Sequence, residues 1–128
     1  MKRVFLSFIA EDKERVAGLR LLAANPNYEL DFYDESVKTA FNSSDANYIK
    51  GRIREKIERS SVTVCLISEN TYKSEWVRWE VEESFRQGKR VIAMALKGVV
   101  QAVLPEPIRS AQLKFYGWDP AALGDLIG

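Results

Sequence analysis

The feature of this 128-residue sequence that most constrains its fold is a regular alternation of short β-branched runs and segments with helical periodicity. Strands are predicted at residues 4–8, 28–33, 62–67, 91–96 and 113–118. Helices are predicted at residues 11–22, from about 49 to 60, at 74–87, and after the Asp119-Pro120 pair. This alternation implies βαβ crossovers, and so an α/β fold with an open, mostly parallel sheet of about five strands and helices on both faces.

Length and charge narrow the class of protein further. A chain of 128 residues fits a single domain, residues 1–128, with one sizeable core. The net charge of +1 gives no electrostatic reason to expect nucleic acid or an anionic membrane as the partner. The lone cysteine, Cys65, lies in an apolar run, and no apolar stretch approaches the roughly 20 residues that span a bilayer. We therefore expect a cytoplasmic protein.

The sequence contains no histidine. This excludes a Ser-His-Asp triad, a Cys-His pair and any histidine-ligated metal, and no metal site is expected. The phosphate-binding glycine patterns of dinucleotide and P-loop folds are also absent. Catalysis would have to rest on carboxylates, hydroxyls, Lys, Arg, Tyr or Cys65, and Cys65 itself is interpreted as core because it lies in the middle of a strand.

Three polar segments follow predicted strands, and they should meet where parallel sheets bind ligands, at the carboxyl ends of the strands. They are residues 7–12, the long loop at 34–45, and residues 68–74. The acidic pair Asp34 and Glu35 could serve acid–base chemistry, although acidic residues at such junctions are more often turn formers. Ser43 or Ser44 is expected to cap the helix that follows.

The most distinctive cluster is the helix that starts at Ser74. Its spacing places Trp76 and Glu80 on one face, beside a stripe with Val77 and Val81 that faces the core. A carboxylate one turn from a tryptophan, near a strand-end crevice, could be partly desolvated with a raised pKa. On spacing alone, a solvated glutamate and a core tryptophan are the favoured interpretation of this pattern.

Taken together, the segments resemble a TIR domain, a flavodoxin-like fold, and more narrowly the TIR-like proteins of Thoeris-type antiphage defence systems. The residues that carry the resemblance are Val4-Phe5-Leu6-Ser7-Phe8 in the first strand, Phe32-Tyr33-Asp34-Glu35-Ser36 at the entry to a mobile loop, the run from Ser60 to Ser68, and Ser74-Glu75-Trp76-Val77 followed by Glu80. The resemblance covers residues 2 to about 96.

The resemblance implies an enzyme that consumes NAD as its substrate and needs no cofactor. It assigns Glu80 as the catalytic carboxylate for cleavage of the nicotinamide–ribose bond. It also implies that six further residues bind the substrate. Phe8 and Ile9 would line the floor of the site, Trp76 its wall, and Asp34, Ser36 and Phe41 the loop that covers the site. Ile9-Ala10 stands where some NAD-cleaving TIR domains carry basic residues.

The expected partners are NAD, a downstream effector that senses a linear or cyclic ADP-ribose signal, and other copies of the domain through TIR surfaces. The alternative is a non-catalytic TIR-type module for protein–protein interaction. A third class is a nucleoside-processing enzyme or a response-regulator-like switch on a similar sheet.

Overall fold

A computed structural model of the chain describes residues 2–22, 28–33 and 40–127. Its centre is a sheet of five parallel strands in the order β2-β1-β3-β4-β5. The strands are β1 (Lys2–Ser7), β2 (Tyr28–Asp31), β3 (Val62–Ile67), β4 (Arg90–Ala95) and β5 (Phe115–Tyr116). The predicted α/β fold with a mostly parallel sheet of about five strands is confirmed.

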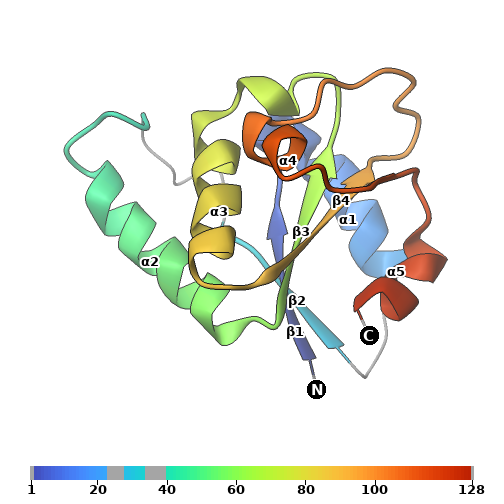
Figure 1. Cartoon of the computed structure of the whole chain (residues 1–128), viewed down its shortest axis with the longest axis horizontal. Helices are drawn as coiled ribbons and strands as arrows, with labels where there is room; N and C mark the ends of the chain where they lie inside the picture. The colour runs from blue at the N-terminus through green and yellow to red at the C-terminus, as the bar shows by residue number, and fades with distance from the viewer. Residues whose placement is uncertain (1, 23–27, 34–39, 128) are drawn as a thin grey trace.

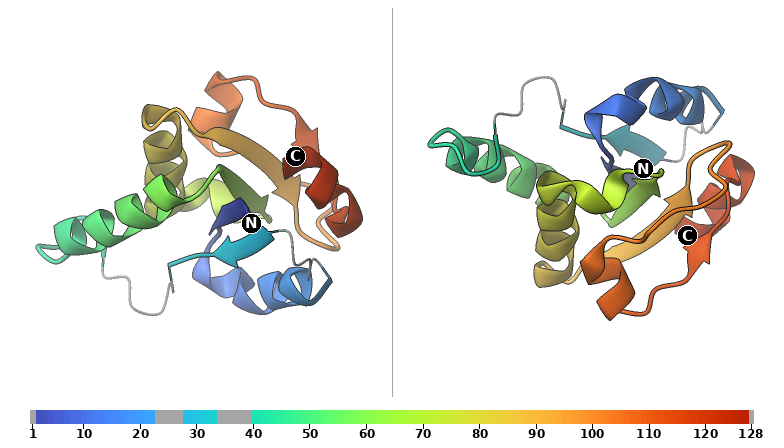
Figure 2. Two further views of the ribbon diagram at one scale, coloured as in Figure 1. Left: turned by 90° about the horizontal axis from the view of Figure 1, so that it is seen from below. Right: turned by 90° about the horizontal axis from the view of Figure 1, so that it is seen from above.

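Five helices surround the sheet: α1 (Lys13–Leu22), α2 (Ala46–Arg59), α3 (Glu75–Arg86), α4 (Glu106–Ser110) and α5 (Pro120–Ile127). Single 3₁₀ turns, η1 (Ala10–Asp12) and η3 (Thr71–Lys73), precede α1 and α3. In Figures 1 and 2, α1 and α5 cover one face of the sheet while α2, α3 and α4 lie on the other. Among the described residues, no helix is long and apolar enough to cross a bilayer.

The two faces of the sheet pack separately because side chains alternate along each strand. Leu6, Val64 and Met94 point toward α1 and α5, where they form one buried cluster. Cys65 and Ala93 point the other way, toward α3 and α4. The α2 helix completes the second face with a stripe of three isoleucines, which packs against Phe5 and Trp76. The stripe consists of Ile49, Ile53 and Ile57. This arrangement buries β3 along its whole length.

Local signals positioned several element ends correctly. The Ser74 side chain accepts a hydrogen bond from the Val77 amide at 3.1 Å and so caps α3. Asp119 caps α5 in the same way, through the Ala122 amide at 3.1 Å. Gly88 takes a positive φ of 73° just after α3, a conformation that glycine adopts without a steric cost.

Other boundaries differ from the predictions. The residue that precedes α2 is Asp45, with no side-chain cap, rather than Ser43 or Ser44. The strand β1 begins at Lys2 because its first residues pair with β2, and it ends before Phe8. The short helix α4 is not among the predicted helices, because five residues are too few to show the hydrophobic periodicity of a helix in the sequence.

Candidate functional site

The strand order reverses at β1, which lies between β2 and β3. The chain leaves β1 toward one edge of the sheet through α1, and it leaves β3 toward the other edge through α3. The loops after β1 and β3 therefore diverge at the carboxyl ends of these two strands, the usual position of ligand sites in such sheets. The first residues of these loops define the candidate site.

Glu80 lies at this point although it comes from the middle of α3. Its side chain is only 1% exposed, and its Oε1 accepts a hydrogen bond of 2.7 Å from the Oγ of Ser7, the last residue of β1. Val77 and Val81, both fully buried, hold this face of the helix against the sheet. A carboxylate is thus fixed at the carboxyl end of β1 by packing on one side and by a hydrogen bond on the other.

Cys65 is the neighbour of Ser7 across the sheet, since the two residues are register partners in β1 and β3. The cysteine is fully buried. Burial raises the pKa of its thiol far above the ordinary value, and the negative charge of Glu80 raises it further. The thiol therefore stays protonated at neutral pH and lacks the thiolate character that a nucleophile needs.

Aromatic side chains flank this carboxylate on the α2 side. Trp76, one turn before Glu80, is buried and packs edge-on against Phe41, with ring centroids 5.0 Å apart. Trp79 contacts Trp76 in the same edge-on manner at 6.4 Å. The Lys50 ammonium lies 4.1 Å from the centre of the Phe41 ring. Residue 41 is thereby anchored to both α2 and α3.

The structure separates two residues that the sequence placed together. Ile9 lies on the α3 face, in the cluster with Cys65 and Val77. Phe8 points to the opposite face, where it packs in the α1 cluster and contacts the Phe32 ring at 5.4 Å between centroids. Adjacent residues in an extended chain point in opposite directions, so Phe8 and Ile9 do not line one surface.

Of the predicted substrate-binding set, Ile9, Trp76 and Phe41 lie on the same side of the sheet as Glu80. Asp34 and Ser36 lie outside the described residues, together with the rest of residues 34–39 of the loop expected to cover the site.

A second polar group joins the two diverging loops, and sequence reasoning did not single it out. The Oγ of Ser68, just after β3, donates a hydrogen bond to the carboxylate of Asp12 in η1, and both residues are buried. The Ser68 amide donates to the Thr71 hydroxyl at 2.8 Å. Burial raises the pKa of Asp12 above its ordinary value, although the Ser68 hydrogen bond and the Arg15 charge oppose the shift.

The only sequence signal for this group is the position of polar residues directly after buried strands. Ser7 carried the same signal, as a small polar residue at the carboxyl end of an apolar run. Neither pattern shows which partner each residue meets. Among the residues described, no cluster of three or more Cys, Asp or Glu side chains could hold a metal ion.

Fold and site together define an open, all-parallel α/β domain with a buried helix carboxylate at its topological switch point. The family of the TIR-like domain of the Thoeris protein ThsB matches residues 5–101, more than half of the chain. The chain therefore belongs to this family, as the sequence resemblance suggested.

Solved structures confirm the fold. A 2-deoxyribosyltransferase from Bacillus psychrosaccharolyticus is similar with a TM-score of 0.66 and 17% identity, over 98% of this chain and 90% of that one. The CMP N-glycosidase BcmB of Clostridium botulinum is similar with a TM-score of 0.63 and 18% identity, over 98% of both chains. At these identities the likeness concerns the fold alone. No curated protein sequence matches the chain.

Proposed function

We propose that this domain is an NAD-consuming enzyme of antiphage defence that cleaves the nicotinamide–ribose bond, with Glu80 as its catalytic carboxylate. The observation that carries the proposal is the position of Glu80: a buried carboxylate, oriented by Ser7, at the carboxyl end of β1 in a TIR-like domain. Structural glutamates on helices usually lie in solvent, so a carboxylate held at the switch point calls for a function.

The chemistry suits the residues that are present. Nicotinamide leaves with the electron pair of the C–N bond and becomes neutral, so positive charge develops on the ribose in an oxocarbenium-like transition state. A fixed carboxylate in a site of low dielectric stabilises that charge without reorganisation. A water oxygen then forms the new bond to the ribose carbon and loses a proton, which gives ADP-ribose; attack by an atom of the same molecule gives a cyclic product instead. No step requires histidine.

The neighbouring side chains have complementary roles in this proposal. Trp76 and Ile9 form the apolar surroundings of the carboxylate, and Phe41 belongs to the loop that closes over the substrate. Asp34 and Ser36 in the same loop contact the polar parts of NAD. The product acts as a signal for a downstream effector, and self-association of the domain completes the site.

The names of the two similar structures are compatible with this chemistry. One is called a 2-deoxyribosyltransferase and the other a CMP N-glycosidase. Because their identity to this chain is low, they add a competing substrate class to the test and do not carry the proposal. Nucleosides and CMP are therefore included beside NAD in the experiment.

The test is incubation of the purified protein with NAD, a nucleoside mixture and CMP, followed by mass spectrometry of the products, with and without lysate from phage-infected cells. Release of nicotinamide with formation of ADP-ribose or its cyclic form supports the proposal. Release of a base from CMP or a nucleoside, with NAD left intact, would assign the domain to the nucleoside-processing class instead.

One observation favours a second candidate, a non-catalytic module for protein–protein interaction. The Glu80 side chain is 1% exposed in this conformation. A carboxylate that never opens to a substrate would act only as a structural element of α3. Inactivity toward every substrate, with and without the lysate, is the outcome expected for this candidate.

A further inference from the structure

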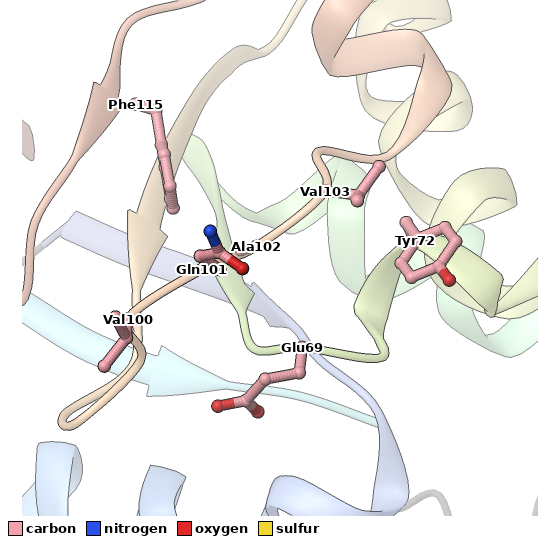
Figure 3. A pocket seen from close by; sticks show the side chains of 7 residues that line it. All are labelled: Glu69, Tyr72, Val100, Gln101, Ala102, Val103 and Phe115. Atoms are coloured by element: carbon pink, nitrogen blue, oxygen red, sulfur yellow. The ribbon is translucent and has the colours of Figure 1, made fainter.

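A hollow of about 590 Å³ lies at the carboxyl edge of the sheet, apart from Glu80, and Figure 3 shows the side chains that line it. They come from three places: the segment after β3, with Glu69 and Tyr72; the segment after β4, residues 100–103; and Phe115 in β5. Its volume falls in the range of small-molecule sites, and its position matches the edge where parallel sheets bind ligands.

The hollow gathers most of the exposed apolar side chains of the described chain. In the described part of the chain, five large hydrophobic residues are exposed. Four of them line this hollow: Tyr72, Val100, Val103 and Phe115. Val100 is 93% exposed, and Phe115 is 38% exposed. Single exposed apolar residues are normal on a protein surface, but a contiguous group around a concavity is typical of a binding site.

Polar groups in the hollow are available to a ligand. Among the described residues, neither the Gln101 amide nor the Tyr72 hydroxyl makes a hydrogen bond. The side-chain amide of Gln101 offers a donor and an acceptor side by side, and the Phe115 ring lines the same hollow. This combination fits a flat heteroaromatic molecule that carries its own donor and acceptor on one edge.

The charge of the hollow argues against anionic ligands. Its lining contains the Glu69 carboxylate and no basic side chain. Arg15 lies 3.4 Å from Glu69, but it is shared with Asp12 at 3.6 Å, so one positive charge faces two carboxylates. The Lys73 ammonium lies 5.6 Å from the centre of the Tyr72 ring, outside the lining. The charged group of the lining itself is a carboxylate, which disfavours a phosphate relative to an uncharged or cationic ring.

We propose that this hollow, lined by Glu69, Tyr72, Gln101 and Phe115, is a second binding site, for an uncharged or cationic heteroaromatic base such as a free nucleobase. The ring packs against Phe115 and the valine side chains, and its polar edge bonds to Gln101. The site stands independently of the proposed cleavage of NAD, because Glu80 does not belong to its lining.

The experiment is titration of the ¹⁵N-labelled protein with adenine up to about 5 mM, with AMP as a matched probe that adds only the ribose phosphate. Adenine is expected to shift the amide signals of residues 69–72 and 100–103. AMP is expected to bind at least about threefold more weakly because of Glu69. Gln101→Leu, which keeps the size but removes the hydrogen bonds, should weaken adenine binding about fivefold or more.

Tyr48→Ala is the control, because Tyr48 is exposed on α2 outside the hollow and should leave adenine binding unchanged. Two results would overturn the proposal: no shift at residues 69–72 and 100–103 at the highest adenine concentration, or shifts confined to Ser7, Ile9 and Glu80. The second result would place the base in the candidate catalytic site, and the first says nothing about NAD cleavage, so the two proposals fail separately.

Discussion

Replacement of Glu80 by Gln tests the proposed chemistry most directly, because it removes a charge and little else. The amide has the size of the carboxylate, and its oxygen can accept the hydrogen bond that Ser7 donates at 2.7 Å. The exchange also preserves the packing of a side chain that is buried against the sheet. We therefore expect the free energy of unfolding to change by no more than about 1 kcal/mol.

The expected loss of activity follows from the electrostatics of the site. A unit charge at roughly 4 Å from the developing positive charge, with an effective dielectric constant near 20, contributes about 4 kcal/mol. The amide dipole retains part of this stabilisation. A net loss of about 2.7 kcal/mol remains, which corresponds to a decrease in turnover of about 10²-fold.

Glu82 provides the matched control on the same helix. Its side chain is 52% exposed and pairs with Arg78 at 2.9 Å, four residues before it. Such a pair contributes little, so Glu82→Gln should change stability by less than about 0.5 kcal/mol and leave turnover at the wild-type value. The assay is NAD cleavage measured by chromatography on the folded variants beside wild type. Equal turnover in all three proteins would refute the catalytic assignment of Glu80.

Three further predictions concern other groups. Ser7→Ala should lower turnover about tenfold while the fold is retained, because the Glu80 carboxylate loses the hydrogen bond that Ser7 donates. Steady-state kinetics measure the turnover and circular dichroism checks the fold; an unchanged kcat would contradict the prediction. Cys65→Ala should cost on the order of 1 kcal/mol through a small cavity and leave turnover intact, and the native thiol should resist alkylation, so rapid labelling would argue against its burial. Glu83→Gln should lower the free energy of unfolding at pH 7 by about 1 kcal/mol. Although burial alone would raise the pKa of Glu83, hydrogen bonds from Arg86 and Gln87 and the charges of Arg86 and Arg54 lower it. The stabilisation by ionised Glu83 is therefore fully present above the pKa that Glu83 has in the unfolded chain, and it is lost as the pH falls through the lower pKa of the folded protein. Urea titrations across this range should show that the difference in unfolding free energy between wild type and Glu83→Gln shrinks as the pH falls.

Much of the fold could be predicted from local patterns. The run at residues 62–67 is apolar throughout and becomes the fully buried β3, because a central strand with helices on both faces has no polar side. The Ser74 cap and the core-facing stripe with Val77 and Val81 placed α3 correctly. These features depend on a few neighbouring residues, so periodicity and capping rules suffice to find them.

The structure places β5 within the strand predicted at residues 113–118, but the bounds of the short elements could not be predicted because they depend on distant partners. The strand β5 has two residues and exists only through its pairing with β4. The first residues of β1 are charged, and they are in the sheet because β2 lies beside them. Pairing of this kind is a property of the assembled sheet and leaves little trace in the local sequence.

For the candidate site, the sequence by itself determined which chemical groups are present: Glu80 one turn after Trp76, no histidine, and small polar residues directly after the strands. Only the tertiary structure decided how these groups meet. It paired Glu80 with Ser7 across 73 residues of chain, joined Asp12 to Ser68 between two loops, and sent Phe8 to the face opposite Ile9. The physical reason is that helical spacing determines the direction of a side chain on its own helix, whereas its partners depend on the register of strands that are far apart in the chain.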